Sequence, residues 1–545
     1  TESSTKQVRY LLDDPGATGV VVEDAELLET IGEVEDDLDL DLVVVMEDVD
    51  DEDREAIGTE LHTLGEVWAL GDETYDDAAF EGWLDERELE DLSSLVYTSG
   101  TTGQPKGVEL THWNWRSCVN QVRKRTAPRP DKPDDVPVLE AGMVGLSILP
   151  LAHAFERWTH YITLASGMTL AYAESVDTVA DDVQKVRPDA IAAVPRVYER
   201  VYDRMREQAS ESSIKQRIFE WAVDVGQAFG EADDPGRWLR TKHAIADRLV
   251  YSTVRETLGG ELDVFVSGGG SLARELAQLY RAMDLTIVNG YGLTETAPVL
   301  TTNPPEANKV GTMGPAIVDV DIAVDPRPVS AETRDAHEGD VGELLARGPN
   351  VFGGYWGMPE KTDEVFTDDV PEDEIPDDPR SEGPWFRTGD IVARDDDGYF
   401  SFVDRLKNVI VLDTGKNIAP EPIEDEFATS DRVDQIMVVG DDEKFVAALV
   451  KPNFDALRRL VEDHGIDVPT EPDQAVGHPR VRAWIEEAIQ LVNMDIAKHE
   501  QIKEFRLVAD EWTPDNDMLT PSMKKKRRNI RERHSELLDD IYREE

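Results

Sequence analysis

The hydrophobic pattern divides the chain into successive regions. From about residue 17 to 300, short apolar runs alternate with segments of amphipathic helical period, which predicts stacked α/β layers. Within this region, residues 200–258 are strongly helical in pattern and are expected to elaborate the large domain. A more β-like portion follows over about residues 308–403. We place a domain boundary near Arg405, which predicts a large domain over residues 1–404 and a small α+β domain over residues 405–545.

A loop rich in glycine, hydroxyl groups and positive charge follows the apolar run at residues 94–96. Residues 97–107 read YTSGTTGQPKG, so backbone N–H groups at the glycines and side-chain hydroxyls can surround an anion, with Lys106 adding charge. It is not a Walker loop, because Pro105 precedes the lysine and Gly107 follows it. Taken alone, such a stretch is as often a surface turn as a phosphate site.

Further motifs follow in order along the chain. An apolar run at residues 285–288 leads into NGYGLTET at 289–296, so an aromatic ring, a hydroxyl and a carboxylate leave a strand end together, which is a typical ligand platform. The remaining motifs are WFRTGDI at 385–391, DRLKN at 404–408, TGKNIAPEPIE at 414–424 and LTPSMKKKR at 519–527.

In this order, the motifs resemble those of the adenylate-forming superfamily, which contains acyl-CoA synthetases, luciferases and the adenylation domains of peptide synthetases. The resemblance covers nearly the whole chain. It implies a large adenylating body of stacked α/β subdomains with a β-rich subdomain, followed by a small mobile α+β domain. It also implies ATP and CoA as cosubstrates and Mg²⁺ as cofactor.

The resemblance assigns a role to each motif. Tyr291, beside Gly292, would stack on adenine, Thr294 would bond the α-phosphate, and Glu295 would hold Mg²⁺, which needs few protein ligands because it keeps several waters. The other implied nucleotide contacts are Thr98, Ser99, Gly100, Thr101, Thr102, Gly103 and Lys106 for phosphate, Gly269 and Gly270 for adenine, Asp390 for the ribose hydroxyls, and Arg405 for ribose or phosphate.

The C-terminal motifs imply a moving domain. Lys407 would lie at the pivot, and Gly415, Lys416 and Asn417 would line the tunnel for the CoA thiol after rotation. The terminal motif resembles that of long-chain acyl-CoA synthetases, with Ser522 where a second threonine is usual, and its register makes Lys524 the catalytic lysine. Five consecutive cations at 524–528 alone would instead favour a nucleic-acid or membrane patch, and the neighbouring lysines keep Lys525 and Lys526 open as alternatives.

Two stretches concern the substrate. PLAHAFER at 150–157 resembles the family motif at the junction of the carboxylate and nucleotide pockets, which would place His153 at the reacting groups. VPRVYER at 194–200 resembles a segment of long-chain enzymes, and both stretches favour a fatty acid. The alternative for His153 is a structural histidine next to an apolar run, and Phe155 is expected to pack rather than gate.

Residues 267–272, SGGGSL, mimic the site where carrier proteins receive phosphopantetheine. They follow an apolar run at 264–266 within the adenylating body, where the superfamily places backbone contacts to adenine. No carrier-sized segment follows the terminal lysine motif, so a modular peptide synthetase is a poor interpretation.

Composition sets the physical setting. The chain has 115 acidic and 56 basic residues and a formal net charge of −59, which concentrated counterions would screen. This balance is typical of proteins from salt-accumulating halophiles such as halophilic archaea. It disfavours nucleic acid as a partner. With 40% hydrophobic residues and 11 tryptophans, the chain can form a core rather than remain disordered.

The lone cysteine, Cys118, excludes a disulfide framework and is consistent with the cytoplasm; we expect it to be buried and without chemistry. No apolar run approaches a membrane span, so any membrane contact would be peripheral. The first residues resemble an internal stretch of the N-terminal lobe of long-chain synthetases. We therefore expect that on the order of one hundred residues of that lobe are absent.

The sequence thus predicts an ATP-dependent, AMP-forming long-chain fatty acid–CoA ligase. The alternatives are an adenylate-forming ligase for a medium-chain or aryl acid, and a non-catalytic acyl- or nucleotide-binding protein. The pattern does not define acyl chain length or oligomeric state.

Overall fold

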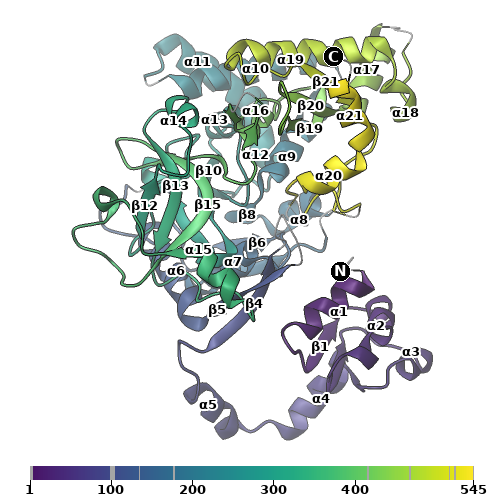
Figure 1. The fold of residues 1–545 in the computed structure, drawn as a ribbon, viewed down its shortest axis with the longest axis vertical. Helices are drawn as coiled ribbons and strands as arrows, with labels where there is room; N and C mark the ends of the chain where they lie inside the picture. Colours follow the sequence, from purple (N-terminus) through teal and green to yellow (C-terminus); the bar gives the residue numbers. More distant parts are fainter. Residues whose placement is uncertain are drawn as a thin grey trace. The chain divides into compact units, whose positions relative to one another are not determined.

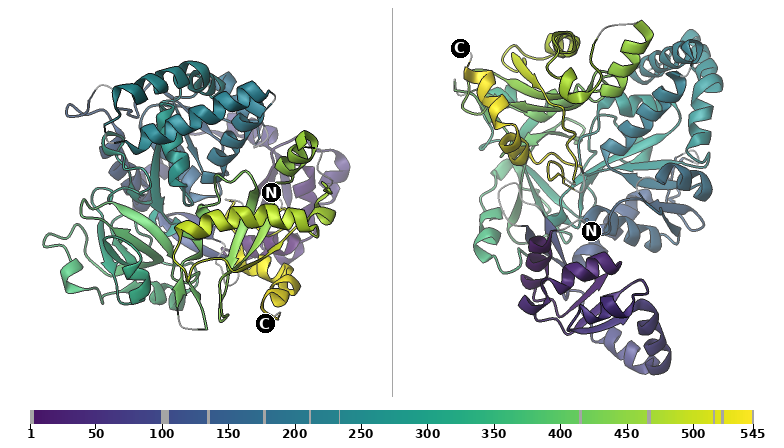
Figure 2. Two further views of the ribbon diagram at one scale, coloured as in Figure 1. Left: turned by 90° about the horizontal axis from the view of Figure 1, so that it is seen from above. Right: turned by 90° about the vertical axis from the view of Figure 1, so that its right-hand side faces the viewer.

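The computed structural model describes residues 4–98, 105–133, 136–175, 178–210, 212–232, 234–413, 416–464, 468–514, 516–520 and 523–543. The chain forms two compact units. Unit 1 comprises Thr1–Trp113 and Gly353–Pro359, and unit 2 comprises Asn114–Phe352 and Glu360–Glu545. Figures 1 and 2 show the elements of both units.

Unit 1 contains a three-stranded parallel sheet in the order β1-β2-β3 and a separate antiparallel hairpin, β4-β5. The valine runs of β1 and β2 suit strands, and Val43 and Val45 are fully buried against Leu28 of α2. The elements are α1 (Thr5–Asp13), β1 (Gly19–Val22), α2 (Ala25–Gly32), β2 (Leu42–Val45), α3 (Asp51–Glu55), β3 (Glu60–Thr63), α4 (Leu64–Thr74), α5 (Asp77–Asp85), β4 (Leu92–Thr98) and β5 (Lys106–Thr111).

The centre of unit 2 is a six-stranded sheet in the order β11-β10-β9-β8-β6-β7. All neighbouring pairs are parallel except β10 and β11. Because the carboxyl ends of parallel strands meet at one edge, the segments after β6, β8, β9 and β10 gather there. The strands are β6 (Val144–Ser147), β7 (Thr169–Tyr172), β8 (Ala190–Ala193), β9 (Val264–Ser267), β10 (Thr286–Gly292) and β11 (Val299–Thr302).

Helices surround this sheet, and those between β8 and β9 form the blue-teal group in Figure 2. This group occupies the segment predicted to be helical, and its apolar faces share one core with the sheet and α13, including Tyr198, Tyr251 and Phe265. The helices are α6 (His112–Thr126), α7 (Ala154–Ala165), α8 (Val179–Val186), α9 (Pro195–Ser210), α10 (Ser213–Glu231), α11 (Arg237–Ala246), a π-helical turn (Asp247–Tyr251), α12 (Ser252–Thr257) and α13 (Arg274–Ala282).

The β-rich portion is a five-stranded antiparallel sheet in the order β12-β13-β15-β14, with β16 paired to β15. Apolar residues such as Leu345 and Trp385 form its core. Its elements are β12 (Asp321–Asp325), α14 (Ala331–Asp335), β13 (Asp340–Arg347), α15 (Pro359–Val365), β14 (Phe366–Thr367), β15 (Trp385–Arg394) and β16 (Phe400–Arg405).

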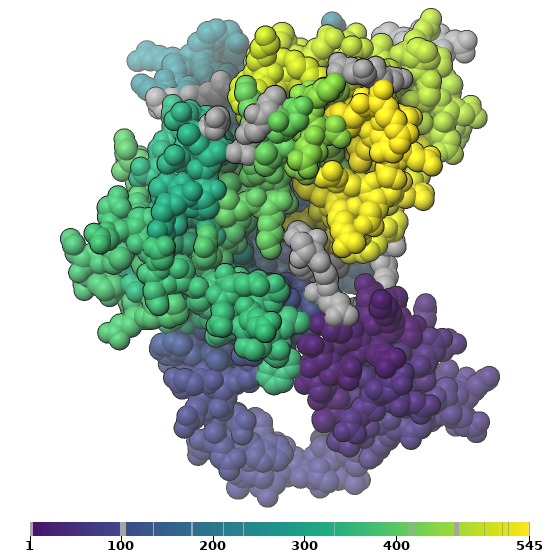
Figure 3. Space-filling view, viewed as in Figure 1, coloured from purple at the N-terminus to yellow at the C-terminus, as the bar shows by residue number. Residues whose placement is uncertain are grey.

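Residues 405–545, which we call the C-terminal lobe, contain a two-stranded sheet, β17-β18, and a three-stranded sheet, β19-β20-β21. Figure 3 shows the last helices in yellow beside the green surface of residues 405–452, and Arg531 of α20 pairs with Asp441 there. The elements are β17 (Ile410–Val411), β18 (Asn417–Ile418), α16 (Pro420–Asp425), β19 (Val433–Val439), β20 (Ala447–Pro452), α17 (Phe454–His464), α18 (Pro472–Ala475), α19 (Pro479–Asp495), β21 (Glu504–Leu507), α20 (Arg527–Arg533) and α21 (Ser535–Arg543).

The predicted fold class, a mixed α/β body with a smaller C-terminal part, is confirmed by this architecture.

Candidate active site

The six-stranded sheet brings three of the sequence motifs to one edge. His153 follows β6, Gly269 and Gly270 follow β9, and Tyr291 lies near the end of β10. Gly269 has a φ of +80°, a backbone conformation that side chains disfavour. At Gly292 a Cβ would lie 1.7 Å from the carbonyl oxygen of Pro298, so only glycine fits there.

Tyr291, Asp390 and Arg405 form a connected polar group. The antiparallel register of β15 and β16 sets Asp390 opposite Arg405, and Arg405 Nε lies 3.3 Å from Asp390 Oδ1. The Tyr291 hydroxyl donates to Asp390 Oδ2 at 2.8 Å. Burial raises the pKa of Asp390, although Arg405 and Tyr291 oppose the shift. Burial and the neighbouring Asp390 carboxylate together raise the pKa of Tyr291 well above its usual value.

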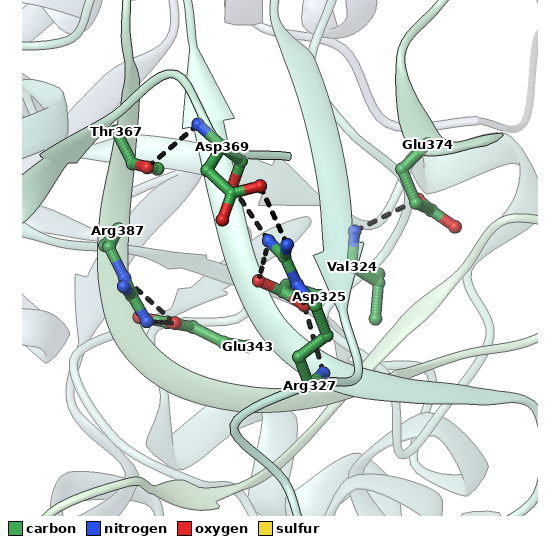
Figure 4. A network of polar contacts seen from close by, with 8 residues as sticks. All are labelled: Val324, Asp325, Arg327, Glu343, Thr367, Asp369, Glu374 and Arg387. Carbon is green, nitrogen blue, oxygen red and sulfur yellow. Dashed lines mark hydrogen bonds and ion pairs between the residues drawn. The ribbon is translucent and has the colours of Figure 1, made fainter. Parts of the chain in front are cut away.

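The segment of β15 that carries Asp390 is held by Glu343 of the neighbouring strand β13, which is 2% exposed. Glu343 accepts hydrogen bonds from the Arg387 guanidinium at 2.5 Å and from the Gly389 N–H at 3.2 Å. Figure 4 shows Arg387 and Glu343 side by side within the wider polar network of this sheet. This segment of β15 is therefore held by a charge-assisted contact.

Thr294 and Glu295 lie in a single 3₁₀ turn, Thr294–Thr296, directly after β10. The Glu295 carbonyl accepts the Phe352 N–H at 2.8 Å, which anchors the turn. The Glu295 carboxylate interacts electrostatically with Asp390, Arg405 and Lys524. One carboxylate of the predicted site thus belongs to the same charged group as the terminal lysine.

Lys524 is held by Thr520, whose hydroxyl accepts the Lys524 N–H at 3.0 Å and whose N–H donates to the Lys524 carbonyl at 2.7 Å. The side chain is exposed to solvent, yet protein surrounds it closely enough to disfavour its charge. This desolvation and the positive Arg405 lower the pKa of Lys524, whereas Asp390, Glu421 and Glu295 oppose the shift.

The neighbouring lysines have other partners. Lys525 pairs with Glu424, which is 5% exposed, and Lys526 pairs with Asp517. Lys524 interacts electrostatically with Asp390 and Glu295. The register in which Lys524 is catalytic stays a prediction.

His153 is the residue that precedes α7, and its N–H donates to the Pro150 carbonyl at 3.0 Å. Burial and the nearby Lys524 ammonium lower the pKa of His153, which favours neutral imidazole. A Cβ at Gly268 would lie 3.1 Å from the Phe155 ring, so Phe155 packs on the backbone after β9.

The proposed pivot and CoA tunnel lie where the C-terminal lobe begins. Lys407 is exposed in a turn in which Asn408 donates its N–H to the Arg405 carbonyl at 2.9 Å. The Lys416 carbonyl accepts the Leu412 N–H at 2.8 Å, and Asn417 pairs with Val411 in the β17-β18 sheet. Gly415 lies outside the described residues.

The motif at residues 97–107, which is predicted to bind phosphate, belongs to unit 1. Thr98 ends β4 opposite Lys106 of β5, and the Lys106 ammonium lies 3.6 Å from the Tyr355 ring centroid. Ser99, Gly100, Thr101, Thr102 and Gly103 lie outside the described residues. Of this predicted loop, the structure describes the pairing of β4 with β5 on either side of it.

Three carboxylates that support the site were not predicted from the sequence, namely Glu343, Glu421 and Glu424. Glu421 accepts the Ser271 hydroxyl at 3.2 Å and interacts with Lys524. Glu424 pairs with Lys525 and Arg527, which directly follow Lys524 in the chain. Glu343 carried a usable signal, because a carboxylate within the apolar run 341–345 must find a partner on burial.

Within the described ranges, no group of three or more His, Cys, Asp or Glu residues is placed to hold a metal. Nor does any helix there have the length and apolar character needed to cross a membrane. Cys118 is fully buried, which raises its thiol pKa to about 12 and agrees with its predicted inertness.

Comparison with known proteins identifies the family. The chain matches AMP-binding enzymes over residues 1–356 and the AMP-binding enzyme C-terminal domain over residues 407–545. It is 31% identical to a long-chain-fatty-acid–CoA ligase of Mycobacterium bovis, with 100% of this chain and 83% of the relative covered. It is also 31% identical to fatty acyl-CoA synthetase A of Dictyostelium discoideum, over 84% of this chain and 65% of the relative.

The fold matches solved structures as well. The adenylation domain of a carboxylic acid reductase from Segniliparus rugosus, solved with AMP and a co-purified carboxylic acid, has a TM-score of 0.72 at 22% identity. The match covers 99% of this chain and 77% of that chain. The chain therefore belongs to the AMP-binding, adenylate-forming enzyme family.

Proposed function

We propose that this protein is an ATP-dependent ligase that activates a long-chain fatty acid as acyl-adenylate and transfers the acyl group to CoA, releasing AMP and pyrophosphate. The observation that carries the proposal is the charged group in which Lys524 interacts with Asp390, Arg405 and Glu295. These four residues come from four separate motifs, so their assembly is not a consequence of local sequence. Names of relatives such as the Mycobacterium bovis ligase support a fatty acid as substrate.

In the first half-reaction, a carboxylate oxygen of the acid attacks the α-phosphorus of ATP and the bond to pyrophosphate breaks. The Tyr291 ring would stack on adenine, Asp390 would accept hydrogen bonds from the ribose hydroxyls, and Thr294 would bond the α-phosphate. Lys524 and Lys106 would stabilise the negative charge that develops in transfer, which is a preorganised electrostatic role. A neutral His153 would contact the substrate carboxylate without adding a second positive charge beside Lys524.

Mg²⁺ fits this site as a partner of ATP. Glu295 is the carboxylate that would hold it, and one protein carboxylate suffices because Mg²⁺ keeps several waters and takes its other ligands from phosphate oxygens. When bound, the ion neutralises charge on the phosphates of ATP.

In the second half-reaction, the CoA thiolate attacks the acyl carbonyl carbon and AMP leaves. Reuse of one site for two reactions would require the C-terminal lobe to turn about Lys407, withdrawing Lys524 and presenting Gly415, Lys416 and Asn417 to the thiol. The exposed turn at Lys407 supports a pivot there.

The test is ATP–pyrophosphate exchange by the purified chain in molar KCl, with acids from acetate to oleate and with benzoate, followed by CoA addition. Exchange that peaks with long chains and CoA-dependent release of AMP would support the proposal. A peak at medium-chain or aryl acids would reassign the substrate. Nucleotide binding without exchange for any acid would contradict the catalytic assignment.

A further inference from the structure

One face of α9 carries a row of charged residues. Arg196, Glu199, Asp203 and Glu207 are spaced by three or four residues, so they share one side of the helix. The sequence motif that contains Arg196 resembles a segment of long-chain enzymes. In the structure, this face of the helix contacts the C-terminal lobe.

Arg196 forms the central contact. Its guanidinium donates to Asp434 of β19 at 2.8 Å and to Glu199 of its own helix at 2.9 Å. Asp434 also pairs with Lys451 of β20, so one carboxylate of the lobe accepts from both sides. The side chains of Arg196, Asp434 and Lys451 are 26%, 23% and 11% exposed, respectively. The ion pairs are therefore largely shielded from solvent.

The electrostatics agree with this geometry. Burial opposes the Asp434 charge, but Arg196 and Lys451 outweigh it, and the net effect lowers the pKa of Asp434. Molar salt, which has a Debye length of about 3 Å, weakens exposed ion pairs much more than buried ones. The Arg196–Asp434 contact is thus suited to persist in the saline conditions that the composition predicts.

Other charges at this contact are mainly acidic. Burial raises the pKa of Asp203, and Asp434 adds to the shift. Asp425 of α16 has a pKa raised well above its usual value by burial, with Glu421 and Glu199 adding to it. Carboxylates from the two sides repel one another, so removal of Arg196 would leave a repulsive surface rather than a neutral one.

A rigid connection runs from this contact to the catalytic lysine. Asp434 and Val438 lie on the same strand, β19. The Val438 N–H donates to Glu424 at 2.7 Å, and its carbonyl accepts from Arg527 at 3.1 Å. Glu424 in turn pairs with Lys525 and Arg527, which follow Lys524 in the chain. The strand that carries Asp434 is therefore bonded, through Glu424 and Arg527, to the segment next to Lys524.

We infer that Arg196 is a positioning residue: through Asp434 and Lys451 it holds the C-terminal lobe in the arrangement that places Lys524 with Asp390 and Glu295. This inference rests on the proposed function for its kinetic consequence. It predicts that Arg196 supports adenylation, in which Lys524 acts, and contributes little to thioester formation.

The kinetic test compares Arg196→Gln, Asp434→Asn and the double variant. Arg196→Gln should slow pyrophosphate exchange by roughly tenfold at saturating ATP and acid, because it removes one partner of a shielded ion pair. Thioester formation from a supplied acyl-adenylate should change less than twofold. The double variant should be no slower than Arg196→Gln, and Arg196→Lys should restore part of the rate.

The matched control is Arg204→Gln, because Arg204 lies on the same helix, is exposed and is not one of the four residues of the charged row. It should leave both half-reactions unchanged. Equal loss of both half-reactions in Arg196→Gln would overturn the inference, and so would wild-type rates in that variant. Additive losses in the double variant would also overturn it.

A second measurement does not depend on activity. Spin labels at Leu249→Cys and Met494→Cys, which are 52% and 71% exposed in the parent chain, report the distance between the large part of unit 2 and the lobe. Native Cys118 is buried and would not react. Arg196→Gln should broaden the distance distribution, and Arg204→Gln should not. An unchanged distance distribution in Arg196→Gln would refute the positioning role. Absence of pyrophosphate exchange by the parent with every acid would refute the proposed function. The two failures are therefore distinguishable.

Discussion

The Tyr291 hydroxyl donates a hydrogen bond of 2.8 Å to Asp390, across 99 residues of sequence. The two residues belong to different sheets, β10 of the six-stranded sheet and β15 of the five-stranded one. This bond fixes the orientation of a carboxylate that is only 2% exposed and that also contacts Arg405. The proposed nucleotide platform therefore depends on the junction of two sheets rather than on either motif alone.

Tyr291→Phe tests this bond. The change keeps the ring that would stack on adenine but removes the donor to Asp390, and a hydrogen bond to a charged group contributes about 1.5–3 kcal/mol. We expect the KM for ATP in pyrophosphate exchange to rise roughly tenfold with a smaller change in kcat. Asp390→Asn should weaken ATP binding at least as much. An unchanged KM in both variants would remove Asp390 from the nucleotide site.

Lys524→Ala tests the register of the terminal lysines. Loss of a preorganised charge at the transition state should slow adenylation by about 10²–10³-fold, while a supplied acyl-adenylate still reacts with CoA. Lys526→Ala is the matched control, because Lys526 pairs with Asp517 and should be dispensable for adenylation. The opposite result, with Lys526→Ala inactive and Lys524→Ala active, would assign the catalytic role to Lys526.

Lys407→Pro tests the pivot. Proline fixes φ and removes an N–H in the turn that begins the C-terminal lobe. We expect pyrophosphate exchange to persist and thioester formation to slow, because only the second half-reaction would require the lobe to turn. Lys407→Ala, which leaves the backbone free, should keep both rates. Equal loss of both half-reactions in the proline variant would argue against a pivot at this residue.

The buried Glu156 side chain is expected to make the free energy of unfolding depend on pH. Its side chain is fully buried, and burial raises its pKa from 4.5 to about 7. The folded protein therefore binds more protons than the unfolded chain between these values, so its stability falls as pH rises through this range. Glu156→Gln should remove this loss and increase the free energy of unfolding at pH 8 by roughly 3 kcal/mol.

Urea denaturation in molar KCl at pH 5 and pH 8 measures this effect. The variant should gain stability over the parent at pH 8 and little at pH 5. Glu81→Gln, at an exposed position of α5, should match the parent at both values. A pH dependence that survives Glu156→Gln would show that other groups cause it.

Much of the architecture follows from the sequence because it depends on local order. The apolar runs at 264–266 and 285–288 coincide with β9 and β10, and the helical pattern at 200–258 corresponds to α9–α12. Strand ends then place Gly269 and Tyr291 at one edge, since parallel strands share a direction. Ionic partners were not predictable in this way. Nothing local distinguishes Lys524 from Lys525 and Lys526, whose partners Glu424 and Asp517 lie 101 and 9 residues away.

The sequence by itself determined the family, the order of the motifs and the fold class, because spacing, turn chemistry and hydrophobic period are properties of neighbouring residues. Only the tertiary structure decided that Glu343 anchors the β15 segment that carries Asp390 and that Arg196 contacts the C-terminal lobe. Such contacts depend on how separate elements pack. The sequence around an arginine does not indicate whether its side chain is exposed or paired with a distant carboxylate. Long-range charge pairing is set by the fold, which the sequence encodes only through the packing of the whole chain.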